Sequence, residues 1–168
     1  KHNTSFPNQR DAGPNLSYDV HYSGPFAAAV EGTLLGIPSI AISLASMRDG
    51  NFAAAARFAG RLGAHVLAAG LPSGITLNVN VPVGDPTAYQ VTFLGHRHFM
   101  HSVDRRTDPR GEPYYWIGGR PALPRDLPGS DCNAVARGVV SITPLSINPT
   151  DRAALCDAIG RMEIDCVE

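Results

Sequence analysis

The chain has 168 residues and a formal net charge of −1, with 14 Lys and Arg against 15 Asp and Glu. This length suits one domain, or one domain with a projecting arm. The near-neutral charge argues against binding of a nucleic-acid polymer, which usually needs a basic face. No apolar run approaches the ~20 residues that span a bilayer, and the start lacks the pattern of a secretory leader. We therefore expect a cytoplasmic protein with no membrane partner.

The first part of the chain predicts a loop followed by a helix. Residues 1–14 have almost no apolar periodicity. Pro25 suits the first turn of a helix and Gly36 suits its end. Within this helix one apolar stripe is expected, formed by Phe26, Val30 and Leu34, with Ala27 as a further candidate.

The next segments repeat the pattern of strand and helix. Residues 37–45, IPSIAISLA, are apolar on both faces, as in a strand inside a parallel sheet. Asn51 and Gly70 suit the two ends of a helix over residues 52–69. Residues 74–82, GITLNVNVP, alternate between apolar and polar and predict another strand. This alternation of elements predicts an α/β domain with a parallel sheet.

A hairpin arm is predicted in the second half. Residues 89–99 and 112–119 are expected to be its strands, and residues 104–111, DRRTDPRG, its turn. Its aromatic patch should bury against a partner; the patch comprises Tyr114, Tyr115, Trp116 and Ile117. A late strand over residues 138–145 and a final helix from Thr150 to Ile159 complete the prediction.

The expected domain organisation has three parts. Residues 1–88 form the α/β core, and residues 89–128 form the arm and a Pro-rich loop for oligomerisation. Residues 129–168 supply the C-terminal strand and helix.

Two groups of potential metal ligands are weak candidates for a metal site. The three cysteines, at positions 132, 156 and 166, have no CxxC spacing, which favours reduced structural thiols over a disulfide. His96, His98 and His101 could form a zinc site or part of a solvated basic arm. The neighbouring arginines favour the arm, because positive charge disfavours a divalent ion.

Oxygen-bearing side chains gather just before the first helix. Ser23 and Gly24 lie where the free N–H groups of a helix start bind anions, although Ser23 could instead serve only as the helix cap. Upstream, Asp11, Asn15 and Asp19 offer oxygen ligands of the kind that Mg²⁺, Mn²⁺ or Ca²⁺ prefer. Together they predict a metal-assisted phosphoryl hydrolase.

The segment AGPNLSYDVHYSG, followed by AAAVEGTLLGIPSIAIS, resembles the central motif of the SurE (survival protein E) family. Further segments are similar to family segments in the same order: LNVNVP, DPRGEPYYWIGG and GSDCNAVARGVVSITPL. The resemblance covers nearly everything from Ala12 to about Ile159.

The resemblance implies a Rossmann-like α/β fold with a hairpin arm used in assembly of homodimers or homotetramers. It implies hydrolysis of nucleoside 5′- and 3′-monophosphates with a divalent metal, Mg²⁺ or Mn²⁺, or else Ca²⁺. Asp11 takes the place of a metal-ligating asparagine, and Asn15, Ser23 and Gly24 take places that line the phosphate pocket.

The chain also departs from the family pattern. It lacks the first third, with its N-terminal strands and the aspartate pair that holds the metal, so the catalytic residues are not assigned. Asp11 replaces the usual asparagine, and Pro25 and Phe26 replace threonine and valine. We expect an N-terminally truncated nucleotidase that alone is weak or inactive. The alternative is an inactive subunit or gene fragment that acts only through assembly.

Overall fold

The computed structural model describes residues 13–46, 51–97, 99–121 and 125–151, with the backbone alone for residues 99–102 and 116–121. In chain order its elements are the 3-10 turn η1 (Ser17–Tyr22), α1 (Gly24–Leu34), β1 (Ser39–Ala45), α2 (Ala53–Ala69), β2 (Ile75–Pro82), β3 (Tyr89–Val91), β4 (Phe99–Thr107), β5 (Pro113–Pro121), α3 (Asp131–Ala136) and β6 (Val140–Ser146). The helix–strand–helix–strand order predicted for residues 25–82 is confirmed. The predicted final helix lies outside the described residues.

Four strands form the core sheet, in the order β1-β2-β6-β3. β1 and β2 are parallel, β6 is antiparallel to β2, and β3 is parallel to β6. Two strands therefore run in each direction, although parallel neighbours predominate. The predicted α/β class with a parallel-dominated sheet is confirmed, whereas the reversed direction of β6 has no signal in the sequence.

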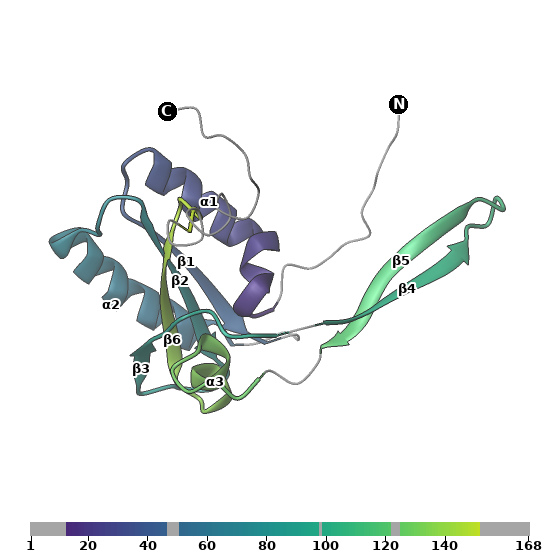
Figure 1. Cartoon of the computed structure of the whole chain (residues 1–168). Helices are drawn as coiled ribbons and strands as arrows, with labels where there is room; N and C mark the ends of the chain where they lie inside the picture. Colours follow the sequence, from purple (N-terminus) through teal and green to yellow (C-terminus); the bar gives the residue numbers. More distant parts are fainter. Residues whose placement is uncertain (1–12, 47–50, 98, 122–124, 152–168) are drawn as a thin grey trace, which may run out of the picture.

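The two faces of the sheet differ in chemistry, and β2 shows the difference most clearly. Its apolar side chains pack against α2 in the hydrophobic core, which contains Ala55, Phe58, Val66, Leu77, Val79, Val81, Val140 and Ile142. The opposite face of β2 carries Thr76, Asn78 and Asn80, all fully buried. α1 and α2 cover opposite faces of the sheet (Figure 1). The polar face, beneath η1 and α1, is where the candidate site lies.

The ends of α1 and α2 agree with the capping predictions, except at the start of α2. Ser23 Oγ accepts a hydrogen bond from Phe26 N at 3.1 Å, and Pro25 occupies the first turn of α1. The N-cap of α2 is Phe52 rather than the predicted Asn51, which lies one residue earlier and whose Oδ1 accepts from Ala53 N at 2.9 Å. Gly70 ends that helix with φ of 75°, as predicted. Among the described residues, no helix is both long enough and apolar enough to cross a bilayer.

The predicted apolar stripe of α1 is wrong. Leu34 is 61% exposed, and the one buried residue of the helix is Ala29. α1 instead approaches the sheet through small and polar residues: Gly32 lies against Ser39, and Thr33 Oγ1 is 2.7 Å from Thr76 Oγ1. A helix that packs on a polar sheet face buries these residues, which apolar periodicity does not predict.

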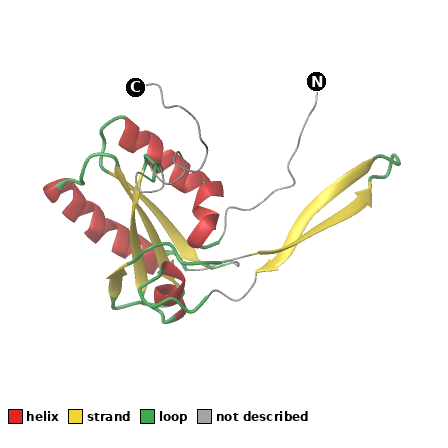
Figure 2. Ribbon diagram, viewed as in Figure 1, coloured by secondary structure: helices red, strands yellow, loops and turns green. Residues whose placement is uncertain are grey.

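The predicted arm exists, but its boundaries are shifted. β4 and β5 form a two-stranded antiparallel sheet that projects from the core, as Figure 2 shows. Residues 89–91, expected in the arm, form β3 of the core sheet, and residues 104–107 belong to β4 rather than to the turn. The turn follows Asp108, whose Oδ1 accepts from Arg110 N at 2.8 Å and Glu112 N at 2.9 Å.

Candidate functional site

The candidate site is built on residues 15–24, which we call the site loop. Asn15, Ser23 and Gly24 are described, whereas Asp11 lies outside the described residues. Asn15 Nδ2 donates to Ser43 Oγ of β1 at 2.5 Å, and Asn15 N donates to Asn80 Oδ1 of β2 at 2.8 Å. The loop therefore begins near the carboxyl ends of the two parallel strands, a common position for ligand sites in α/β sheets.

Two buried asparagines of β2 hold the backbone of Asn15. Asn78 Nδ2 and Asn80 Nδ2 both donate to Asn15 O, at 2.9 Å and 3.1 Å. Asn78 Oδ1 is buried and has no partner among the described residues. The segment LNVNVP thus anchors the site loop, a role that its β-strand alternation did not reveal.

The start of α1 has fewer free donors than the sequence suggested. Phe26 N donates to the cap Ser23 Oγ, and Pro25 has no N–H. Ser23 N donates to Val20 O at 3.2 Å. The N–H of Gly24, the first residue of α1, lies beside this cap. An anion here would meet the Gly24 N–H and the hydroxyl of Ser23, which is both a helix cap and a candidate ligand.

A buried carboxylate outside the predicted site joins the site loop to two other segments. Asp131, at the start of α3, is fully buried. Its Oδ2 accepts from Ser17 N at 2.8 Å, while its Oδ1 accepts from Gly95 N and Cys132 N, each at 2.7 Å. Asp131 was not among the site residues predicted from the sequence. The sequence did offer a signal for the helix that Asp131 begins. Serine is a favoured N-cap residue, and Ser130 Oγ caps α3 by accepting from Asn133 N.

Asp19, which was considered as a metal ligand, lies beside a cation instead. Arg97 Nη1 is 3.3 Å from Asp19 Oδ2 in a partly buried pair. Burial raises the pKa of Asp19 above its ordinary value; Arg97 opposes this effect, and the negative charge of Asp131 adds to it. A carboxylate paired with Arg97 is a poor ligand for a divalent cation.

The described residues do not test whether the three histidines lie together, because only His96 has a described side chain. His96 lies in the loop before the arm, where its Nδ1 is 2.9 Å from Tyr18 Oη and the two rings meet edge to face. His98 and the side chain of His101 are not described. Among the cysteines, Cys132 is a free, buried thiol, as expected, and positions 156 and 166 lie outside the described residues.

The described residues do not by themselves form a cage for a divalent metal. No group of three or more His, Cys, Asp or Glu side chains lies close enough together among them. Asp131 already accepts three N–H donors, and Asp19 is paired with Arg97. Asn15 and Ser43 offer neutral oxygens only, which bind Mg²⁺ weakly without carboxylates. No chemical step is therefore assigned to a metal held by these residues.

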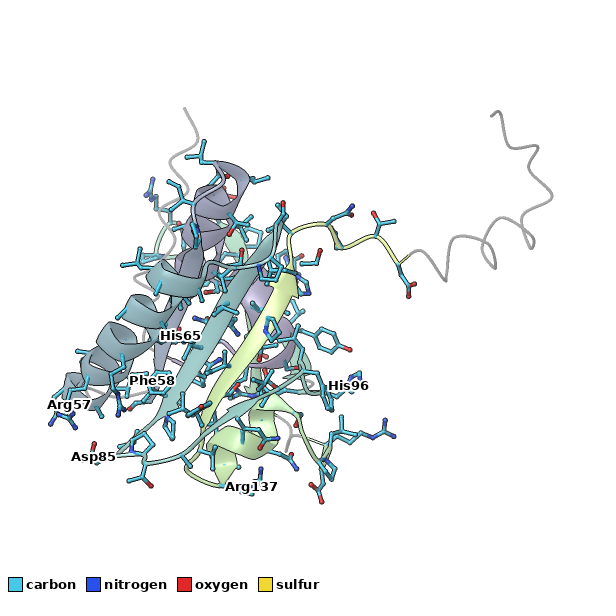
Figure 3. All side chains as sticks on the ribbon, turned by 90° about the vertical axis from the view of Figure 1, so that its left-hand side faces the viewer. Arg57, Phe58, His65, Asp85, His96 and Arg137 are labelled. Atoms are coloured by element: carbon cyan, nitrogen blue, oxygen red, sulfur yellow. The ribbon has the colours of Figure 1, made fainter. Side chains whose placement is uncertain are left out.

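The hollow between α2 and β3 is separate from the candidate site. It has a volume of about 400 Å³, and its lining includes Phe58, His65 and Tyr89. Figure 3 shows Phe58 and His65 along α2, with His96 on the other side of strands β2 and β6. This hollow opens on the α2 face of the sheet, whereas the site loop lies on the α1 face.

Comparison with known proteins identifies the family. The family model for survival protein SurE matches residues 5–101. A 5′-nucleotidase SurE of Myxococcus xanthus is 49% identical over 150 residues, covering 88% of this chain and 57% of the relative. A 5′-nucleotidase SurE of Desulforudis audaxviator is 46% identical over 156 residues, covering 91% of this chain and 60% of the relative.

A solved structure agrees with these matches. The crystal structure of the SurE protein from Aquifex aeolicus is similar with a TM-score of 0.73 and 35% sequence identity. The match covers 90% of this chain and 62% of that one. The chain thus spans little more than half the length of the curated relatives that it matches.

Proposed function

Because the chain belongs to the survival protein SurE family, we propose that it is part of a nucleotidase that hydrolyses nucleoside 5′- and 3′-monophosphates with a divalent metal. One observation carries this proposal. The site loop is fixed at the carboxyl ends of β1 and β2, and it leads directly into the start of α1 at Ser23 and Gly24. This geometry brings polar groups to a helix N-terminus, where a phosphate is stabilised.

Each predicted site residue has a proposed role. Ser23 Oγ and Gly24 N would bind phosphate oxygens, and Asn15, held by Asn80 and Ser43, would line the pocket. Asp11 would be a metal ligand, together with carboxylates from outside this chain. The metal, Mg²⁺ or Mn²⁺, would supply charge stabilisation and a positioned water.

The 168-residue chain alone is proposed to hydrolyse phosphomonoesters weakly or not at all. The match covers only 57% of the Myxococcus xanthus relative, and the described residues hold no carboxylate cage. In this proposal the complete enzyme is a cytoplasmic homodimer or homotetramer assembled through the arm.

A second candidate function is an inactive subunit that acts only through assembly. The arm favours it, because Val103 and Tyr115 are 61% and 63% exposed on a hairpin that projects from the core. An isolated two-stranded hairpin is marginally stable without a partner surface.

A phosphate-release assay tests the proposal. The 168-residue chain is compared with a fusion in which the N-terminal segment of the Myxococcus xanthus relative precedes it, both assayed with nucleoside monophosphates and Mn²⁺. We expect release only from the fusion, and EDTA should abolish it. A folded fusion without activity would contradict the nucleotidase proposal and favour the inactive subunit.

A further inference from the structure

The carboxylate of Asp131 binds two segments that are distant from each other in sequence. It accepts N–H donors from Ser17 in the site loop and from Gly95, which precedes the arm. These two residues are 78 positions apart, and a second bond joins them directly, from Ser17 Oγ to Gly95 O at 2.7 Å. A fully buried carboxylate with three N–H donors is strongly held, because hydrogen bonds to charged groups are stronger than neutral ones.

Ser17 forms the other half of this contact. Its Oγ also accepts from Arg97 N at 2.9 Å, and its φ of 56° lies in the left-handed region, which non-glycine residues rarely adopt. An unfavourable backbone conformation persists only when its surroundings hold it. Here the surroundings are Asp131 on one side and Gly95 and Arg97 on the other.

The start of α3 packs so closely against Gly95 that a side chain there would be crowded. A Cβ atom there would lie 3.0 Å from Asp131 Oδ1 and 3.1 Å from Cys132 Sγ. The chain entering the arm therefore passes directly against the start of α3.

The chain leaving the arm is tied to the same place. Arg125 N donates to His96 O at 3.0 Å, which joins the two ends of the arm. Asn133 Nδ2 of α3 donates to Asp126 Oδ1 at 2.6 Å. We call residues 95–97 and 125–127 the arm root. α3 thus contacts both sides of the root and, through Asp131, the site loop.

We infer that Asp131 is a positioning residue that couples the arm root to the site loop, so that the placement of the arm determines the placement of Asn15 and Ser23. The functional part of this inference rests on the proposed nucleotidase activity and on assembly through the arm. The physical coupling does not, because it depends only on the contacts of Asp131, Ser17 and Gly95.

Replacing Asp131 with Asn removes one of these contacts selectively. The two oxygens of Asp131 accept three N–H donors, two at Oδ1 and one at Oδ2. An asparagine has one oxygen, which should take the position that accepts two donors. Its NH₂ group then faces the N–H of Ser17, so this donor loses its acceptor. Ser17 is then tied to the arm root only through its Oγ, while the N–H of Gly95 stays bound.

Amide hydrogen exchange on the 168-residue chain tests the coupling. In Asp131→Asn we expect exchange of residues 17–22 to rise about ten-fold or more, the effect of leaving a buried donor unpaired. Exchange in β2 should change much less. The matched control is Asp108→Asn at the arm turn, where both N–H donors bind the same oxygen, Asp108 Oδ1. Asparagine keeps this acceptor, so exchange should change little, either at residues 108–112 or at residues 17–22.

A second variant tests the coupling in the opposite direction. Ser17→Gly tolerates the positive φ but removes the hydroxyl that contacts Gly95 O and Arg97 N. We expect faster amide exchange at Arg97, on the arm side, although Asp131 is still present in this variant. Unchanged exchange of residues 17–22 in Asp131→Asn, or equal acceleration there and in β2, would overturn the inference. So would an unaffected Arg97 in Ser17→Gly.

Kinetics of the fusion then test the functional part. Asp131→Asn should lower kcat about ten-fold or more at a temperature where the fold is intact, since small displacements of binding groups are costly. Asp108→Asn should leave kcat unchanged. If the exchange results are as expected but Asp131→Asn has the same kcat as the parent, the functional part is wrong and only the structural coupling stands. A fusion with no activity contradicts the proposed function alone, because the exchange results still decide the coupling.

Discussion

Asn80 and Asn15 bind each other in both directions: Asn15 N donates to Asn80 Oδ1 at 2.8 Å, and Asn80 Nδ2 donates to Asn15 O at 3.1 Å. A side-chain amide that pairs in this way with a backbone acts like a short piece of β-ladder. It fixes the position of one residue at the start of the site loop. This relationship gives the first prediction.

Asn80→Ala should destabilise the protein by roughly 1–3 kcal/mol, because it leaves the buried N–H of Asn15 without its acceptor. Asn78→Ala is the matched control. Asn78 lies on the same face of β2 and is equally buried, but it makes one hydrogen bond to Asn15, and its Oδ1 has no partner among the described residues. Urea denaturation should show the larger loss for Asn80→Ala, and equal losses would contradict the role given to this pair.

Ser23 is predicted to have two separable roles. Ser23→Ala removes the α1 cap and should cost about 0.5–2 kcal/mol in unfolding experiments. Ser23→Asn retains a capping side chain and should lose little stability. In the fusion, both variants lack the hydroxyl, so both should weaken inhibition by inorganic phosphate. If Ser23→Asn keeps the inhibition constant of the parent, Ser23 is a helix cap and nothing more.

Cys132 should make the stability of the fold depend on alkaline pH. Burial, followed by the charge of Asp131 and a hydrogen bond with it, raises the pKa of the thiol from 9.0 to about 12. Because the folded pKa is above the unfolded one, this contribution to stability is complete below about pH 9 and is lost as pH rises toward 12. Cys132→Ala should remove this part of the alkaline loss in urea titrations.

Alkylation of the unsubstituted chain tests the burial and the raised pKa of Cys132 in a second way. Iodoacetamide at pH 8 should modify Cys132 far more slowly in the folded chain than in denaturant, since the thiolate is the reactive form. Peptide mass spectrometry distinguishes Cys132 from the other two cysteines. Rapid modification of folded Cys132 would contradict both its burial and its raised pKa.

Local patterns were sufficient to predict the core elements and the position of the site loop. The cap at Ser23 and the glycine after α2 are local signals, and the structure agrees with both. The strand expected over residues 37–45 is also present as β1, although it lies at the edge of the described sheet rather than inside it. The site loop was predicted because its polar residues directly precede a helix. Such signals require only a few consecutive residues.

Long-range polar contacts were not predictable in this way. Asp131 binds Ser17 over a separation of 114 residues, and Asn80 binds Asn15 over 65. No periodicity encodes such pairs. The stripe of α1 was misassigned for a related reason, since the helix packs through Ala29, Gly32 and Thr33 on a polar sheet face. The limits of the arm were misplaced because β3 and β4 both contain aromatic and β-branched residues, so composition does not distinguish them. They nevertheless pair with different strands.

The last prediction concerns assembly through the arm. Val103 and Tyr115 are exposed. In the register of the hairpin, Val103 pairs with Ile117 and Tyr115 pairs with Arg105. Residues 103, 105 and 115 therefore share one face of the arm. Apolar exposure on a projecting hairpin is typical of a surface buried by a partner.

We expect the double variant Val103→Ser, Tyr115→Ser to shift the chain from oligomer to monomer in sedimentation velocity at micromolar concentration. Loss of two large apolar contacts from the centre of an interface typically costs several kcal/mol, which is sufficient to change the association state. Val83→Ser is the matched control, because Val83 is 65% exposed on the core and outside the arm. An oligomer that survives the double variant, or a parent that is already monomeric, would show that this face of the arm does not hold the assembly together.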